Sequence, residues 1–201
     1  PGRRYTHGQD ITDVPPRKVI ESGVAHVPED RQKNGMVADF PITDNMILQT
    51  YHKRPFSQGL IRQERPIEEN ADEQVGKFDV RTPSIHANIG TLSGGNQQKA
   101  IIAREFSRDS KLLIVAQPTR GVDVGSIEFI HKQIVKMRDA GTAVLLVTTE
   151  LDEILSLSDR VVVMYAGSVA GTLDISEADR ETVGLLMAGI TDKAKTEGEV
   201  V

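Results

Sequence analysis

Short apolar runs alternate with amphipathic stretches through the second half of the chain. Residues 112–116 form an unbroken apolar run, and residues 24–27 and 143–148 are mostly apolar; all three stretches predict buried strands. Between them, apolar residues recur at helical spacing over 96–107 and 125–140. One stripe of the second helix is assigned to the core: Ile127, Ile130, Ile134 and Met137. This alternation predicts an α/β fold with a mostly parallel sheet and right-handed crossovers.

The first 90 residues are more polar and are expected to form shorter elements. The opening stretch predicts a polar turn, a short strand and a helix that Asp13 caps and Gly23 ends. Residues 35–90 predict a helical region that prolines break into pieces, with Thr43 or Asp44 as a cap and a helix over 66–78.

The C-terminal part predicts a helix, a hairpin and a last helix. The first helix is expected over 151–156, and residues 160–166 and 167–173 predict two strands joined at Gly167 and Ser168. Ser176 is expected to cap the last helix, and Gly189 to end it. Residues 191–201 are polar and predicted to be disordered.

Composition excludes several classes of protein. The 201 residues suit one domain with a sizeable core. A net charge of −5 from interspersed charges gives no basic footprint for nucleic acid, so no nucleic-acid partner is expected. The sequence has no cysteine, which excludes disulfides and thiolate metal sites, and its apolar runs are far shorter than the roughly 18 residues of a membrane-spanning helix.

Residues 92–99, which read LSGGNQQK, are the stretch most suggestive of chemistry. A serine and two glycines lead into a helix whose first N–H groups have no internal partner, and the helix dipole there favours negative charge. Glycine also lets a ligand approach the backbone closely. The pattern predicts an anion site, although an ordinary helix cap after a turn has the same local pattern.

This octapeptide resembles the signature loop of ABC transporter ATPases, in the form carried by importers of simple sugars and nucleosides. The resemblance runs from about Asp10 to Gly189. It implies a P-loop NTPase-like cassette: residues 1–190 form a partial nucleotide-binding domain, with a helical and signature subdomain at about 36–107, and 191–201 form a tail. It also implies that the signature residues contact ATP held by another cassette, and we carry this over to Ser93, Gly94, Gly95, Asn96 and Gln97.

Two further loops match the family in order. Residues 28–31 resemble the Q-loop, which couples the nucleotide site to the membrane subunit, with Glu29 in place of the usual glutamine. Residues 118–123 resemble the D-loop, which passes between two cassettes, and Asp123 belongs to it. The resemblance therefore adds Glu29 and Asp123 to the candidate nucleotide-binding residues, whereas ordinary turns would explain both stretches without chemistry.

The family's catalytic groups are replaced in this sequence. Where ATP-hydrolysing cassettes have an aspartate for Mg²⁺ and then a catalytic glutamate, this chain has Ala116 and Gln117, and Thr149 stands at the position of the switch histidine. Alanine has no oxygen for a metal, and a glutamine amide is not a useful base. The P-loop pattern G-x-x-x-x-G-K-[ST] is not found either. We expect a cassette fragment, truncated or cleaved, with no intact catalytic residue and no metal site, inactive alone, whose ATP and Mg²⁺ are held mainly by a partner cassette.

Three functions are compatible with this sequence. The first is the degenerate second cassette of an importer ATPase, partnered by the N-terminal cassette of the same protein, by transmembrane permease subunits and, indirectly, by an extracytoplasmic solute-binding protein. That cassette would lie at the cytoplasmic face of the cell membrane. The second is a non-transport ABC protein that uses nucleotide-driven dimerisation, and the third is an unrelated α/β enzyme or binding module. Residues 116–125 most resemble nucleoside-type importers, with ribose or galactose importers as the close alternative.

Overall fold

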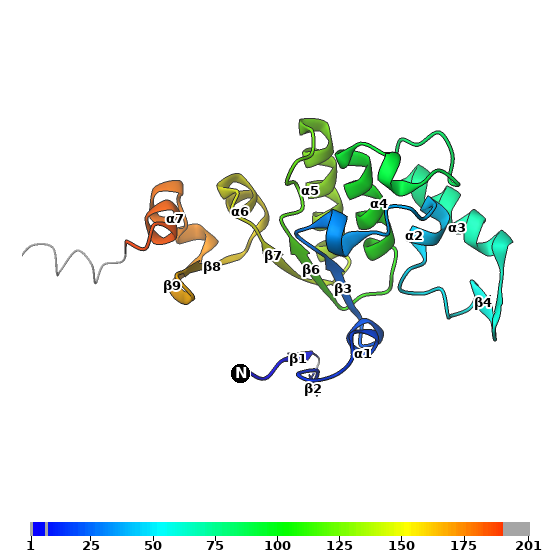
Figure 1. Ribbon diagram of the computed structural model, residues 1–201. Helices are drawn as coiled ribbons and strands as arrows, with labels where there is room; N and C mark the ends of the chain where they lie inside the picture. Colours follow the sequence, from blue (N-terminus) through cyan, green and yellow to red (C-terminus); the bar gives the residue numbers. More distant parts are fainter. Residues whose placement is uncertain (1, 7, 191–201) are drawn as a thin grey trace, which may run out of the picture. The chain divides into compact units, whose positions relative to one another are not determined.

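The computed structural model describes residues 2–6 and 8–190 (Figure 1). The chain divides between Val147 and Thr148 into two compact units, which are described separately. None of the helices in the described ranges is long and apolar enough to cross a bilayer. The expected tail at 191–201 lies outside the described residues.

A three-stranded parallel sheet forms the centre of the first unit. It contains β3 (Val24–Val27), β6 (Leu112–Ala116) and β7 (Ala143–Val147) in the order β3-β6-β7. Ala25 and Val27 pair in register with Leu113 and Val115, and all four side chains are fully buried. The three expected strands are therefore confirmed, as is the α/β class with a parallel sheet.

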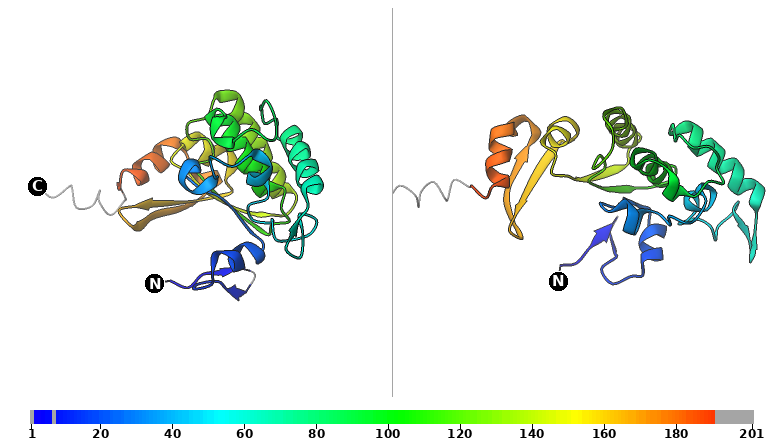
Figure 2. Two further views of the ribbon diagram at one scale, coloured as in Figure 1. Left: turned by 45° about the vertical axis from the view of Figure 1, so that its right-hand side comes forward. Right: turned by 45° about the horizontal axis from the view of Figure 1, so that its top comes forward.

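Two long helices pack against this sheet and against each other. Helix α4 (Gly94–Phe106) contacts β3, and α5 (Val124–Asp139) contacts β7, so the two lie side by side along the sheet (Figure 2). Ile130 and Ile134 of α5 are buried, as the stripe predicted. Helix α4 begins at Gly94, two residues earlier than expected, because the glycines adopt helical conformation immediately after Ser93.

The expectation that residues 143–148 are buried is wrong for one face of β7. Strand side chains alternate between faces, and Leu145 and Val147 are 52% and 50% exposed. Val144 and Leu146 pair in register with the buried Leu113 and Val115 and are partly covered. An apolar run thus predicted the strand correctly, but the described residues supply cover for only one of its faces.

The remaining elements of the first unit are short. Hairpin β1 (Tyr5–Thr6) and β2 (Gln9–Asp10) precedes α1 (Pro16–Glu21), and a π-helical turn, η1 (Arg31–Gly35), follows β3. Then come α2 (Ile42–Met46), hairpin β4 (Ser57–Gln58) and β5 (Ile61–Arg62), α3 (Glu64–Lys77) and a 3₁₀ turn, η2 (Ile89–Thr91).

Two predicted helix caps in this unit are wrong, one at Asp13 and the other at Thr43 or Asp44. Prolines 15 and 41 occupy the N-cap positions of α1 and α2, because proline is well suited to the start of a helix. Asp13 therefore lies outside α1, and Thr43 and Asp44 lie inside α2. Gly23 does end α1, with φ +88, and α3 begins two residues before Pro66.

The second unit is a hairpin packed against two helices. Strands β8 (Arg160–Tyr165) and β9 (Ser168–Asp174) are antiparallel, and α6 (Leu151–Leu157), a 3₁₀ turn η3 (Ile175–Glu177) and α7 (Arg180–Met187) complete it. Its core contains Val161, Val163 and Val183. The hairpin turn falls at Ala166 and Gly167, both with positive φ, one residue earlier than expected.

The predicted cap of the last helix is also corrected. Ser176 lies in η3, and the carboxylate of Asp179 instead accepts a hydrogen bond from the N–H of Thr182 at 2.7 Å. Gly189 follows the helix with φ +79, and its N–H donates to the carbonyl of Leu186, as a helix-terminating glycine does.

Candidate functional site

The candidate anion site lies at the start of α4. Ser93 occupies the N-cap position and is exposed, yet its hydroxyl makes no capping hydrogen bond to the first turn. The first helical bond runs from the N–H of Gln97 to the carbonyl of Ser93, at 2.9 Å. The N–H groups of Gly94, Gly95 and Asn96 therefore have no partner within the helix and are suited to an anion.

Both signature glycines are closely packed against other loops. A Cβ on Gly94 would lie 2.6 Å from Nη2 of Arg31 and 3.2 Å from the carbonyl oxygen of Gly121. A Cβ on Gly95 would lie 2.8 Å from Oδ2 of Asp123. These glycines are thus required for close approach within this chain, in addition to any contact with a ligand.

Arg31 joins the loop after β3 to the loop after β6. Its guanidinium donates to the carbonyls of Arg120 and Gly121, at 2.7 and 3.2 Å. Beside it, Glu29 forms an ion pair with Arg120 at 2.7 Å, and both side chains are more than half exposed. The Q-loop, D-loop and signature loop expected from sequence therefore meet at one place.

The second half of the octapeptide forms hydrogen bonds in the interior of the protein. Gln97 is buried; its amide nitrogen donates to the carbonyls of Gly90 and Leu92, at 3.2 and 3.0 Å, and its amide oxygen accepts from Gln32 at 2.7 Å. These bonds tie the signature loop to η1 and to the turn before it. The geometry suits Gln97 to positioning the loop.

Lys99 and Asp123 anchor two further loops. Lys99 Nζ lies 2.8 Å from Oδ2 of Asp79 and 5.0 Å from the ring centre of Phe129, and the ion pair lowers the pKa of Asp79. Asp123 caps α5 through the N–H and hydroxyl of Ser126, at 3.0 and 2.8 Å, and these hydrogen bonds lower the pKa of its carboxyl group. Asp123 is therefore an ionised cap beside Gly95.

Strand β6 ends at the residues predicted to be degenerate. Ala116 pairs with Val147, and Gln117 follows with φ +48, its N–H donating to the carbonyl of Val147 at 2.8 Å. Thr149 belongs to the second unit. In the described parts of the chain, no group of three or more His, Cys, Asp or Glu side chains could hold a metal ion.

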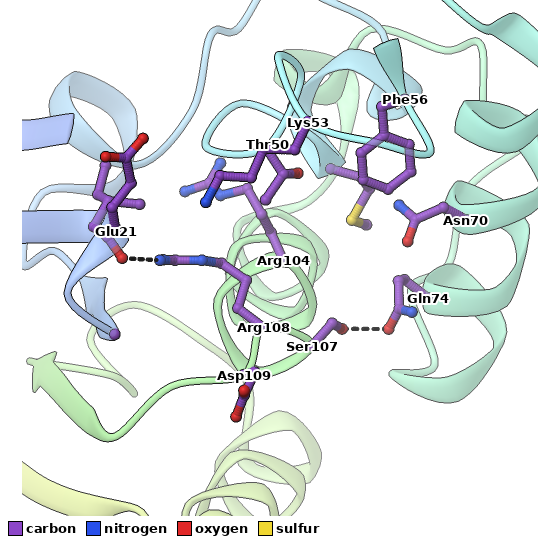
Figure 3. Close-up of a pocket in the computed structure, with 13 residues that line it drawn as sticks. Glu21, Thr50, Lys53, Phe56, Asn70, Gln74, Arg104, Ser107, Arg108 and Asp109 are labelled. Carbon is purple, nitrogen blue, oxygen red and sulfur yellow. Dashed lines mark hydrogen bonds between the residues drawn. The ribbon is translucent and has the colours of Figure 1, made fainter. Parts of the chain in front are cut away.

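A polar cavity of about 290 Å³ lies elsewhere in the first unit, between α1, α3 and the end of α4 (Figure 3). Its two arginines are already bonded: Arg104 Nη2 donates to the carbonyl of Gly35 at 2.8 Å, and Arg108 Nη2 to that of Ile20 at 3.0 Å. Gln74 and Ser107 bond each other across it. Because both guanidinium groups are already hydrogen-bonded within the protein, the cavity is poorly suited to binding a phosphate.

Sequence reasoning missed Arg31, Gln32 and Arg120. Arg31 contacts carbonyls 89 and 90 residues away, and Gln32 contacts a side chain 65 residues away. Local spacing carries no signal for such pairs. Only the position of Arg31 within the expected Q-loop, residues 28–31, could have drawn attention to it.

Comparison with known proteins places these loops in context. The model of the ABC transporter family matches residues 2–120. The chain is 48% identical over 187 residues to the guanosine import ATP-binding protein NupO of Bacillus subtilis, which covers 93% of this chain and 37% of that protein. It is 42% identical over 204 residues to the glucose import ATP-binding protein TsgD13 of Haloferax volcanii, covering 100% of this chain and 37% of the relative. The chain thus spans little more than a third of the length of these relatives.

Solved structures agree on the fold. The ATP-binding cassette MJ0796, in a dimeric post-hydrolysis state bound to ADP and phosphate, matches with a TM-score of 0.69 at 18% identity, over 87% of this chain and 74% of the other. A cassette named MJ1267 matches with the same TM-score at 19% identity, over 100% and 78%. At such identities the likeness establishes the fold alone. Together with the family match over more than half its length, it establishes that this chain belongs to the ABC transporter family as an ATP-binding cassette.

Proposed function

We propose that this chain is the catalytically degenerate half of the ATPase of an importer for nucleosides or simple sugars, and that it supplies its signature loop to ATP bound by a partner cassette. Relatives that import guanosine and glucose support the solute class. Because the chain spans 37% of their length, we assign the activity to a longer protein whose other cassette holds the nucleotide.

One observation carries this proposal: the two halves of a nucleotide site are unequal in this chain. The start of α4 has an exposed serine hydroxyl and unpaired N–H donors, which fit the oxygens of a phosphate. The end of β6 has Ala116 and Gln117, neither of which is a carboxylate. The chain is thus suited to contacting a phosphate and unsuited to activating water.

The same residues decide how ATP and Mg²⁺ fit. Ser93, Gly94 and Gly95 would hold the terminal phosphate, and Asp123 and Glu29 would keep the neighbouring loops in place. Mg²⁺ neutralises charge on transferring phosphates when bound. Because Ala116 and Gln117 at the end of β6 carry no carboxylate, the ligands of Mg²⁺ are assigned to the partner cassette.

A membrane permease is the proposed second partner, and an apolar groove supports it. The groove, about 460 Å³, lies between α2 and the β4–β5 hairpin. Three of its apolar side chains are exposed: Phe40 and Tyr51 are 45% and 52% exposed, and Leu60 is fully exposed. In this proposal a cytoplasmic segment of the permease covers this surface, and the protein lies at the inner face of the membrane. A solute-binding protein would act indirectly.

The ATPase rate of the intact importer tests the proposal. Gly94→Asp places a charged side chain against Arg31 and Gly121 and in the phosphate site, and it should abolish turnover. Gln117→Ala should change turnover by less than about threefold, because no general-base contribution, typically about 10²–10⁴-fold, remains there to lose. Normal turnover in Gly94→Asp, or a large defect in Gln117→Ala, would show that the roles are assigned to the wrong halves.

A further inference from the structure

Asn96, on the first turn of α4, makes a hydrogen bond with each end of its amide. Its Oδ1 accepts from the N–H of Arg81 at 2.8 Å, and its Nδ2 donates to Oγ of Ser93 at 2.9 Å. A backbone N–H can only donate, so the oxygen of the amide must face Arg81. The NH₂ group must then face Ser93, and it can only donate there.

This orientation determines what the Ser93 hydroxyl can do. A hydroxyl group has one proton to donate and two lone pairs that accept. Because its oxygen already accepts from Asn96, the proton of Ser93 points to another acceptor. The Ser93 oxygen does not cap the helix, and Ser93 is exposed beside first-turn N–H groups that have no partner within the helix.

The loop that fixes Asn96 is itself anchored. Lys99, one turn further along α4, reaches back to Asp79 and bonds both its carbonyl and its carboxylate, at 3.1 and 2.8 Å. The Lys99 side chain is 8% exposed. Val80 between the two contacts is buried, so the N–H of Arg81 is held in place.

We propose that Asn96 is a positioning residue that presents the Ser93 hydroxyl as a hydrogen-bond donor to the phosphate of ATP. This rests on the proposed function, since it assumes that Ser93 contacts nucleotide held by the partner cassette. It adds the reason why an asparagine stands three residues after the serine. If the role of Asn96 were purely structural, it would only hold the 79–81 loop, and the direction of the Ser93 proton would not affect activity.

Two substitutions at Asn96 separate these roles. In Asn96→Asp, one carboxylate oxygen can still accept from Arg81, but the other accepts from Ser93 and turns its proton away from the phosphate. In Asn96→Ala the hydroxyl is released and can still rotate toward the ligand. A negative charge in the first turn also favours the helix, whereas alanine loses the Arg81 bond. Positioning therefore predicts the lower activity for Asn96→Asp, and a structural role predicts it for Asn96→Ala.

The test measures ATPase turnover of the full-length protein assembled with its permease in proteoliposomes, together with thermal unfolding. Ser93→Ala and Asn96→Asp should each lower turnover by about 10²–10³-fold, the usual cost of one preorganised donor, and Asn96→Ala by about tenfold or less. Asn96→Asp should unfold at a temperature equal to or above that of Asn96→Ala. Gln133→Glu, the same change from amide to acid on α5, should leave turnover unchanged.

The double variant Ser93→Ala with Asn96→Asp distinguishes the proposed mechanism from simple charge repulsion. If Asn96 acts through Ser93, the aspartate costs less than about threefold once the hydroxyl is gone, because the two changes remove the same interaction. An equal loss in both backgrounds, or higher turnover in Asn96→Asp than in Asn96→Ala, overturns the inference. Near-normal turnover in Ser93→Ala instead overturns the proposed function on which it rests.

Discussion

Replacing Gly94 by alanine should destabilise the protein through Arg31. The new Cβ would lie 2.6 Å from Nη2 of Arg31, and real Cβ atoms do not approach so closely. The guanidinium must therefore move, which breaks its bonds to the carbonyls of Arg120 and Gly121.

The expected magnitude follows from these contacts. Two hydrogen bonds of about 0.5–1.5 kcal/mol each amount to roughly 1–3 kcal/mol lost. Alanine recovers roughly 0.5–1 kcal/mol, because it restricts the unfolded chain more than glycine does. We therefore expect Gly94→Ala to lower the free energy of unfolding by roughly 0–2.5 kcal/mol.

Chemical denaturation of the 201-residue chain, followed by circular dichroism, measures this change. The matched control is Gly76→Ala in α3, where a Cβ would meet nothing within 4 Å and should stabilise the helix. In an Arg31→Ala background the clash with Nη2 is absent and only the 3.2 Å approach to the carbonyl oxygen of Gly121 remains, so Gly94→Ala should be less destabilising than in the wild type. Equal destabilisation in both backgrounds would refute the role of Arg31, as would a loss in Gly76→Ala as large as in Gly94→Ala.

Three more predictions concern the same unit. Glu105 is buried and pairs with Arg104 and Arg108, both at 2.9 Å, so Glu105→Gln should cost about 3–5 kcal/mol in the free energy of unfolding, because it leaves buried guanidinium groups without a counter-charge. Hydrogen bonds from Ser126 lower the pKa of Asp123, so the carboxylate stabilises the fold fully above its ordinary pKa of 3.8 and less as the pH falls below it. The stability difference between the wild type and Asp123→Asn, measured by denaturation at several pH values, should therefore shrink in acid, and a constant difference would contradict this. The isolated chain should bind ATP too weakly for micromolar affinity in calorimetry, because it lacks the P-loop amides and lysine, and heat of micromolar binding would count against a site shared between cassettes.

The sequence by itself determined the elements whose patterns are local. The mostly apolar stretch 24–27 and the apolar run 112–116 predicted β3 and β6 with their observed bounds, because a strand covered by helices needs apolar side chains. Glycines 23 and 189 marked helix ends, because a positive φ there suits glycine. The octapeptide likewise identified the family and, to within two residues, the start of α4, since both are properties of adjacent residues.

Tertiary structure decided what depends on distant residues. The exposed face of β7 could not be predicted from its apolar run, because burial depends on which other elements cover it. Arg31 contacts Gly94 and Gly121, which are distant from it in the sequence. The hydrogen bond from Arg81 that orients Asn96 likewise joins two separate segments of the chain. The sequence therefore indicated which loop carries the chemistry. The packing of three loops against α4 determined how the hydroxyl of Ser93 is oriented.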